Sequence, residues 1–388
     1  MTITVTGPMT SPDTEFKGSD RWIQFGSVRY PYHLRYDAAD ELAAMLGWLD
    51  ADLFLLVSDA GLSRDLVART RRRIIATGTP CIVLRFGGGE QAKTMTSVHR
   101  LARKAVLAGA TRRSVVVAFG GGLVGNIAGL LAGLLFRGIR LIHMPTTLLA
   151  ASDSVLSLKQ AGNLPGVGKN LVGMFQPPQL VFADLAVLES LPRREIQAAM
   201  GEWIKNTLAI RPQDYERVRA LLNPDAVYTP ADLAVMIELC IEAKCSVMAD
   251  DPREEGDGLV LEYGHTCGHV VEQRAGVPHG LAVGIGMCVA ATVGRRLGRF
   301  DEAAEAAHYE LLRRNGAPTR LPNGMSPETV LNGVSLDNKR GRLRPIPGHH
   351  VMVMLERLGR PYRTDGLPLV HVPDEVLHAA LRDLAPAA

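Results

Sequence analysis

Short apolar runs alternate with amphipathic stretches in the first half of the chain. Four apolar runs have the length of strands, at residues 53–58, 81–86, 114–119 and 139–143. An alternating pattern over residues 23–36 predicts a further pair of strands. The stretches between the runs have helical periodicity, at residues 63–76, 91–107 and 124–136. Strands that alternate with helices favour an α/β fold with a wound, mostly parallel, Rossmann-like sheet.

The pattern changes near residue 185, after a proline-rich segment. Five stretches now have helical periodicity, at residues 194–210, 231–249, 259–274, 281–297 and 302–315, and one strand is predicted at 351–355. Residues 1–20 are rich in Thr, Ser, Pro and Gly, which predicts poor order. We therefore expect a disordered segment at 1–20, an α/β domain at 21–184 and a mainly α-helical domain at 185–388.

One stretch has an alternative interpretation. Residues 114–136 carry no charge, are long enough to cross a bilayer, and contain a Gly-x-x-x-Gly spacing. Three consecutive glycines at 120–122, however, break the stretch into a strand and a helix. We therefore favour two buried elements of an α/β core over a membrane span.

Charge and cysteine content add limits on partners and location. The 388 residues include 43 basic and 40 acidic side chains, so no bulk field favours nucleic acid. The five cysteines form no Cys-x-x-Cys pair, which is typical of a reducing compartment. The N-terminus lacks the basic and apolar regions of a signal peptide. We expect a cytoplasmic protein with no nucleic-acid or membrane partner.

Two glycine-rich loops follow predicted strands, at the end of a parallel sheet where ligands bind. The loop at 120–122 opens the next helix, where backbone N–H groups can approach a pyrophosphate, and the other loop lies at 87–89. Asp59 also ends a strand, where a carboxylate can accept ribose hydroxyls. The alternatives are tight turns for the glycines, whose spacing is not Gly-x-Gly-x-x-Gly, and a helix N-cap for Asp59.

Short polar islands lie between apolar runs after residue 145. Lys159, Lys169 and Asn170 lie in these islands, where they can bind a phosphate or carboxylate. A single lysine is usually a solvated surface residue, but the apolar flanks of these islands weaken that interpretation.

Glu202, His265 and His279 form a candidate metal-binding set. One carboxylate and two imidazoles can hold a divalent ion and leave positions open for substrate. Lys205 shares a helical face with Glu202, which is also the pattern of a surface ion pair. His265 and His269 share a face as well, and either can instead be a core histidine. Spacing alone leaves these alternatives open.

Several motifs together resemble the sugar phosphate cyclases of the dehydroquinate synthase superfamily, over residues 28–355. They are Gly-Gly-Gly at 120–122, Phe-Arg-Gly at 136–138, Pro-Thr-Thr at 145–147, Asp153 with Lys159, Gly-Lys-Asn at 168–170, Gly201-Glu202 with Lys205, Gly-His-Thr at 264–266 and Pro-His-Gly at 278–280. The resemblance implies an NAD-binding N-terminal domain, a helical metal-binding C-terminal domain, an active site between them and a homodimer.

Within the superfamily the chain departs from dehydroquinate synthase. Asn126 stands where that branch has aspartate, and Glu262 stands where it has asparagine. Residues 149–160, 262–265 and 337–341 instead resemble the branch that converts glucose 6-phosphate into the carbocycle of 2-deoxystreptamine antibiotics. The substrate expected from this resemblance is glucose 6-phosphate.

The resemblance also implies roles for individual residues. Zinc or cobalt would be held by Glu202, His265 and His279. NAD would be contacted by Asp59, Glu90, Lys93, Gly121, Gly122, Asn126, Thr146 and Thr147. Catalysis would involve Lys159, Lys205, Lys244, Glu262 and His269. Substrate would be bound by Arg137, Asp153, Asn163, Lys169, Asn170 and Lys339.

Three other functions remain as alternatives. The first is another cyclase of the superfamily, such as 3-dehydroquinate synthase, that acts on a heptulosonate phosphate or on sedoheptulose phosphate. The second is a metal-dependent alcohol dehydrogenase of the glycerol dehydrogenase type, which would release NADH. The third is a catalytically silent regulatory subunit, which the intact metal and lysine residues argue against.

Overall fold

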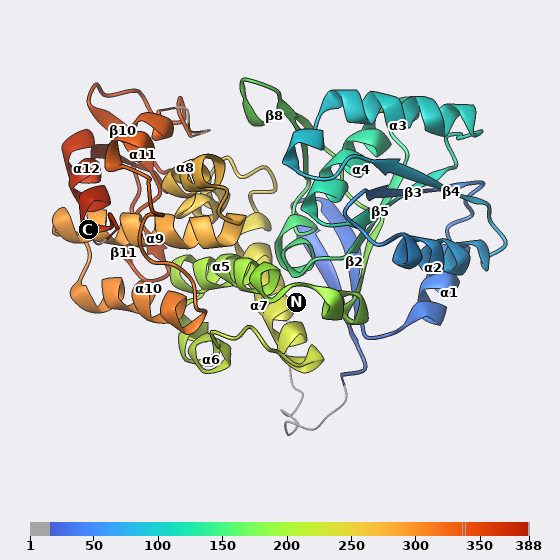
Figure 1. Cartoon of the computed structure of the whole chain (residues 1–388), viewed down its shortest axis with the longest axis horizontal. Coiled ribbons are helices and arrows are strands. Elements are labelled where there is room, and N and C mark those ends of the chain that lie inside the picture. The colour runs from blue at the N-terminus through green and yellow to red at the C-terminus, as the bar shows by residue number, and fades with distance from the viewer. Residues whose placement is uncertain (1–15, 336, 338, 387–388) are drawn as a thin grey trace.

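The computed structural model describes residues 16–335, 337 and 339–386, which form two parts that lie side by side (Figure 1). The N-terminal part contains a seven-stranded sheet with the order β1-β2-β9-β6-β5-β3-β4. Its strands are β1 (Ser19–Phe25), β2 (Val28–Arg35), β3 (Phe54–Asp59), β4 (Cys81–Phe86), β5 (Val115–Gly120), β6 (Arg140–Pro145) and β9 (Leu180–Asp184). Only β1 and β2 pair antiparallel within this sheet, so the predicted wound, mostly parallel sheet is confirmed.

Helices cover both faces of the sheet. They are α1 (Ala39–Gly47) and α2 (Arg64–Ile75) on one face, and α3 (Met95–Leu107) and α4 (Gly122–Leu134) on the other. Leu55 and Val57 of β3 pack with α3 and α4, whereas Phe54 and Leu56 pack with α1 and α2. Burial on both faces explains why these strands appear in the sequence as unbroken apolar runs.

An antiparallel hairpin that the sequence did not predict follows β6. It consists of β7 (Lys159–Leu164) and β8 (Gly168–Phe175). A Cβ at Gly173 would lie 2.4 Å from the carbonyl oxygen of Gln160, so glycine lets the two strands approach each other. Because the hairpin is polar and glycine-rich, it lacks the apolar alternation by which strands are recognised.

The C-terminal part is mainly helical. Its helices are α5 (Arg193–Ala209), α6 (Tyr215–Leu221), α7 (Pro230–Met248), α8 (His265–Ala275), α9 (His279–Arg296), α10 (Glu302–Arg314), α11 (Pro327–Val334) and α12 (Asp374–Asp383). Four short strands accompany them: β10 (His349–Met352), β11 (Leu355–Arg357), β12 (Arg360–Pro361) and β13 (Val370–Pro373). Helix α9 lies at the centre and packs against α5, α8, α10 and α12.

Several predicted boundaries need correction. The helix expected at 259–274 begins only at His265, because residues 257–262 form a 3-10 helix and Gly264 adopts a left-handed conformation with φ 78°. Residues 1–15 of the segment expected to be disordered lie outside the described residues, and β1 begins at Ser19, opposite Leu34. Within the described part, no helix is long and apolar enough to cross a membrane, and residues 114–136 contain β5 and α4.

Candidate active site

Three side chains from three helices converge between the two parts of the chain. Glu202 lies on α5, His265 is the first residue of α8, and His279 is the first residue of α9. The Oε1 atom of Glu202 lies 3.6 Å from Nε2 of His265 and 3.5 Å from Nε2 of His279. One ligand atom from each residue lies within 4.8 Å of the others. The structure thus brings together all three predicted metal ligands.

Both imidazoles are oriented through their other ring nitrogen. Nδ1 of His265 lies 3.2 Å from the carbonyl oxygen of Tyr263, and Nδ1 of His279 lies 3.1 Å from a carboxylate oxygen of Glu272. With a proton on each Nδ1, both Nε2 atoms present a lone pair toward Glu202, as metal-binding histidines do.

The charges around these residues fit a bound cation. The Oε1 atom of Glu202 is buried and has no hydrogen-bond partner among the described residues. Burial, assisted by nearby Lys205, holds the pKa of His265 well below its usual value, so its ring is neutral. Burial alone would lower the pKa of His279, but the carboxylates of Glu202 and Glu272 raise it to about 10. These two carboxylates therefore favour a positive charge at Nε2 of His279, which a metal ion can supply in place of a proton. A buried carboxylate with two Nε2 atoms fits a divalent ion with open coordination positions.

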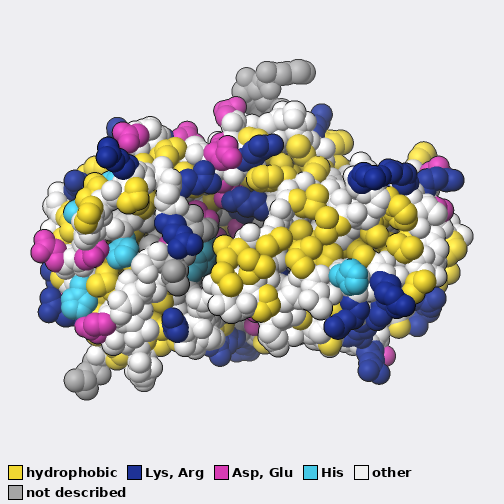
Figure 2. All heavy atoms as spheres, turned by 90° about the horizontal axis from the view of Figure 1, so that it is seen from above, with side chains coloured by type: hydrophobic (Ala, Val, Ile, Leu, Met, Phe, Trp, Pro, Cys, Tyr) yellow, Lys and Arg dark blue, Asp and Glu magenta, His cyan; other side chains and the backbone are white. Residues whose placement is uncertain are grey.

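A cleft of ≈ 560 Å³ opens beside these three residues and is lined by elements of both parts of the chain. In Figure 2 the surface is hollowed between the two parts, and Lys, Arg and His side chains lie in the hollow. The predicted site residues that line it are Lys93, Asn126, Asp153, Lys159, Asn170, Glu202, Lys205, Lys244, Glu262, His265, His269 and His279. A cleft of this size suits a small phosphorylated substrate.

Each of the five lysines predicted to act on substrate has a carboxylate partner in or beside this cleft. The pairs are Lys159–Glu254 at 2.6 Å, Lys169–Glu272 at 2.9 Å, Lys244–Asp153 at 2.8 Å, Lys205–Glu202, and Lys339 with Asp337 at 2.8 Å and Glu262 at 3.3 Å. The lysine charge is therefore nearly balanced before any anion binds.

The most buried of these pairs stay ionised. Burial would raise the pKa of Glu262, but Lys339 and nearby histidines hold it well below its usual value. Burial would lower the pKa of Lys205 and of Lys339, but the carboxylates around them raise both. The cleft therefore presents fixed opposite charges close together, which is the arrangement that stabilises charge developing on a reacting molecule.

The two glycine loops and Asp59 lie at the carboxyl edge of the sheet. A Cβ on Gly122 would lie 2.8 Å from Oγ of Ser154, and one on Gly121 would lie 3.2 Å from Cγ2 of Thr147, so this turn at the start of α4 has no room for side chains. Oδ1 of Asp59 accepts hydrogen bonds from the N–H groups of Gly61 and Leu62, in the loop before α2. The N-cap of α2 is Ser63, so the helix N-cap interpretation of Asp59 is wrong. A helix N-terminus with bare backbone fits the pyrophosphate of a dinucleotide.

Other residues predicted to contact NAD make hydrogen bonds that stabilise this edge of the sheet. Asn126 donates to the carbonyl of Gly122 and accepts from N–H of Ala161, and Thr147 accepts from N–H of Ala150. The N–H of Thr146 donates to the carbonyl of Gly120.

The hairpin is joined to the second glycine loop by amide contacts. Asn163 donates to a carboxylate oxygen of Glu90 at 2.8 Å and accepts from N–H of Asn170, whose side chain accepts from buried Lys93 at 2.5 Å. Burial lowers the pKa of Lys93. These residues are thus positioned beside the cleft, and their contacts with cofactor or substrate stay predictions.

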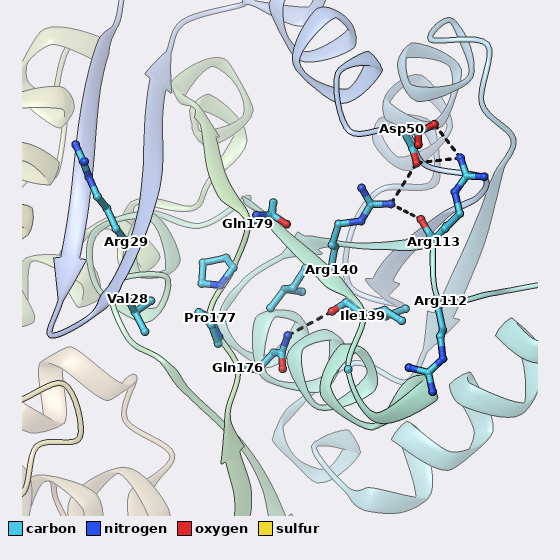
Figure 3. Close-up of a pocket in the computed structure, with 13 residues that line it drawn as sticks. Val28, Arg29, Asp50, Arg112, Arg113, Ile139, Arg140, Gln176, Pro177 and Gln179 are labelled. Atoms are coloured by element: carbon cyan, nitrogen blue, oxygen red, sulfur yellow. Dashed lines mark hydrogen bonds and ion pairs between the residues drawn. The ribbon is translucent and has the colours of Figure 1, made fainter.

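Arg137 is the one predicted site residue that the structure places away from both the cleft and this edge. It is exposed and follows α4, whose 13 residues carry the chain roughly 20 Å from the glycine loop. Its neighbour Gly138 lines a second groove of ≈ 720 Å³. Figure 3 shows that Arg140 and Arg113 meet Asp50 in this groove, whereas Arg112 points away from them. No residue of the predicted site is among those described as lining it.

Two carboxylates of the site were missed from the sequence. Glu254 is buried, has a left-handed backbone with φ 56° and pairs with Lys159. Its loop gave no periodic signal. Glu272 contacts Lys169 and His279. Burial would raise the pKa of Glu272, but these two partners lower it to about 2. Its spacing of seven residues from His265 on one helical face could have revealed it.

A wound sheet joined to helices that carry a Glu-His-His set is the arrangement of the dehydroquinate synthase class. The profile of the 3-dehydroquinate synthase N-terminal region matches residues 83–198, and that of the C-terminal region matches residues 199–340. Because these matches cover more than half of the chain, it belongs to the dehydroquinate synthase family.

Relatives place the chain more narrowly. The 2-deoxy-scyllo-inosose synthase of Streptomyces lividus is 47% identical over 369 residues, covering 94% of this chain and 95% of the relative. That of Micromonospora echinospora is 46% identical, covering 94% and 91%. A crystal structure of 2-deoxy-scyllo-inosose synthase with carbaglucose-6-phosphate, NAD+ and Co2+ superposes with a TM-score of 0.88 at 36% identity, covering 94% of this chain and 99% of that one. Within its family, the chain belongs with the 2-deoxy-scyllo-inosose synthases.

Proposed function

We propose that this chain converts glucose 6-phosphate into 2-deoxy-scyllo-inosose and inorganic phosphate, in the biosynthesis of a 2-deoxystreptamine antibiotic. The observation that carries the proposal is the convergence of Glu202, His265 and His279 on one point of a lysine-lined cleft. Relatives named for this activity and a solved structure with a glucose 6-phosphate analogue support it.

Bound cofactors would supply chemistry that side chains lack. When bound, NAD would supply a reversible hydride acceptor, and a divalent ion, Zn2+ or Co2+, would supply positive charge to polarise the sugar hydroxyls. Glu202, His265 and His279 would hold the ion. The carboxyl edge of the sheet, with Asp59, Gly121 and Gly122, would hold NAD. Since the overall conversion loses phosphate without net oxidation, NAD would be regenerated in each cycle.

The chain's own residues would bind the phosphate and move protons. Lys159, Lys169 and Asn170 would bind the phosphate, which leaves from C6 after the neighbouring C5 proton is removed. Glu262 is ionised and lines the cleft, so it is suited to accept a proton or to bind a hydroxyl. His269, neutral because burial lowers its pKa, and Lys205 lie beside the metal ligands. Lys244 is fixed by the carboxylate and carbonyl oxygens of Asp153.

We further propose that the protein is a cytoplasmic homodimer. Four exposed apolar side chains lie at the end of α4 and on the β7–β8 hairpin: Leu134, Leu164, Val167 and Leu171. In Figure 2 hydrophobic side chains gather beside the hollow, over the N-terminal part. Such a patch is typical of a protein–protein interface. Arg137, next to this patch in sequence, would then lie near the partner subunit. Sedimentation at several concentrations tests the dimer, and a monomer throughout would refute it.

The proposed reaction is tested with glucose 6-phosphate, catalytic NAD+ and Co2+, by measuring phosphate release and the mass of the carbon product. Phosphate with a cyclic ketone and no net NADH is expected. Release only from a seven-carbon sugar phosphate would point to another cyclase. Accumulation of NADH, followed by its absorbance, would point to a dehydrogenase instead.

A further inference from the structure

Glu272 connects the two parts of the chain at the metal-binding residues. It lies on α8, and its two carboxylate oxygens have different partners. Oε1 accepts from Nζ of Lys169 at 2.9 Å, and Oε2 lies 3.1 Å from Nδ1 of His279. Lys169 belongs to β8, in the N-terminal part, whereas His279 begins α9 in the C-terminal part. A continuous set of contacts therefore runs from the hairpin through Glu272 to His279.

The two predicted histidine ligands are oriented in different ways. His265 is held by the backbone carbonyl of Tyr263, two residues away on the same segment. His279 is held by a side chain, and that side chain is itself held by a lysine from the other part of the chain. The orientation of His265 is therefore local, while that of His279 depends on the position of the hairpin.

A hydrogen bond of this kind strengthens a metal-binding imidazole. The carboxylate fixes the proton on Nδ1, directs the Nε2 lone pair toward the ion and makes the ring a better donor. Lys169 can contribute because it occupies one oxygen of Glu272 and so limits rotation of the carboxylate. Lys169, Glu272 and His279 are each less than one-third exposed, so water competes only partly for these contacts.

We propose that Glu272 is a positioning residue that couples Lys169 of the hairpin to the metal ligand His279. The affinity for the metal ion then depends on contact between the two parts of the chain. Lys169, which is predicted to bind phosphate, also supports the metal site. This inference rests on the metal site of the proposed function. The alternative is an ion pair that joins the two parts without influencing the metal.

Cobalt titration without substrate or NAD separates these possibilities. Metal-free protein is titrated with Co2+, and the visible absorption of the ion gives both the affinity and the coordination. Glu272→Gln retains size and one hydrogen-bonding oxygen but lacks the charge, so we expect affinity to fall roughly 10–100-fold and the spectrum to change. Lys169→Met should weaken binding less, by roughly 3- to 10-fold, because it acts only through Glu272. Gln273→Ala, an exposed neighbour on the same helix, is the matched control and should bind as the wild type does.

The double variant tests the coupling itself. If Lys169 acts through Glu272, adding Lys169→Met to the Glu272→Gln variant should not lower its Co2+ affinity any further. Additive losses would overturn the coupling, and unchanged affinity and spectrum in Glu272→Gln would overturn the positioning role. Circular dichroism shows whether Glu272→Gln folds. If it does not, the Co2+ affinity of Lys169→Met tests the proposal by itself, and an affinity equal to that of the wild type would contradict it. A wild-type chain that binds no Co2+ would instead refute the metal site of the proposed function, and this inference with it.

Discussion

Gly201 and Gly280 bring helices α5 and α9 into direct backbone contact. A Cβ on Gly201 would lie 2.1 Å from the carbonyl oxygen of Gly280, and one on Gly280 would lie 1.8 Å from that of Ala198. Gly201 immediately precedes Glu202, and Gly280 immediately follows His279. The close approach of the two glycines is therefore what allows a carboxylate on one helix to face an imidazole on the other.

Substitution of Gly201 by alanine should damage the metal site and the fold together. The new methyl group must push α5 and α9 apart, so we expect unfolding free energy to fall by roughly 1–3 kcal/mol or more. Co2+ affinity should fall as well. Gly47→Ala is the control, since a Cβ there meets nothing within 4 Å, and it should change stability by less than about 1 kcal/mol. Wild-type Co2+ affinity in Gly201→Ala would show that the approach is not needed.

His279→Ala should lose the metal, whereas His269→Ala should retain it. His269 lies next to both other histidines, with ring centroids 5.1 and 6.1 Å away, but only His265 and His279 form a metal-binding set with Glu202. Removal of a ligand should weaken binding by more than the roughly 10–100-fold that loss of an outer hydrogen-bond partner costs. Metal content by mass spectrometry measures this. Stoichiometric metal in His279→Ala would instead identify His269 as the third ligand.

Glu262→Gln should reduce turnover while NAD binding is unchanged. The substitution removes a carboxylate that can move a proton, so a loss of roughly 10²–10⁴-fold in kcat is expected. Lys339 keeps Asp337 as a partner at 2.8 Å, so the fold should survive, and the thermal midpoint checks this. Phosphate release at wild-type rate would remove Glu262 from the mechanism.

Acidification should destabilise the protein through His308. This histidine is buried; Tyr263 lies 2.8 Å from its Nε2, the carbonyl of Ala304 lies 2.7 Å from its Nδ1, and burial lowers its pKa to about 4. The unfolded chain, with an ordinary pKa of about 6.5, binds this proton more readily. Stability is therefore full above about pH 6.5 and falls as pH drops toward 4, by about 2 kcal/mol between pH 7 and 5.

Urea unfolding of wild type and His308→Gln at both pH values measures this contribution. The variant lacks the titrating group, so its stability should depend less on pH over this range. An equal dependence in the two proteins would show that other groups, such as buried His143, account for the whole effect.

The parts of the fold that could be predicted from the sequence are those with strong apolar patterns. Strands such as β3 and β5 are buried on both faces and appear as apolar runs, so their order and type were recognised. The β7–β8 hairpin was missed because its residues alternate only weakly and its pairing depends on Gly173. The start of α8 was missed because the apolar residues of the preceding 3-10 helix continue the helical pattern.

The metal residues were found by chemistry and resemblance, and spacing alone did not decide among them. His265 and His269 have equivalent helical positions, and only the packing of α5 and α9 shows that Glu202 faces His265 and His279. Glu254 could not be found, because a loop brings it to Lys159 from 95 positions away. Arg137 was assigned by motif, and the length of α4 places it outside the cleft of its own chain.

The balanced pairing of the cleft lysines also bears on how the enzyme recovers after each cycle. Glu254 and Glu272 already pair with Lys159 and Lys169, the two lysines that the phosphate would contact, so the phosphate shares each of these cations with a carboxylate. Once phosphate is cleaved from the sugar, it loses the attachment that held it in place, and the carboxylates beside the lysines repel it. Inorganic phosphate should therefore be a poor product inhibitor, since each lysine that recognises it on the substrate has a carboxylate neighbour that favours its release.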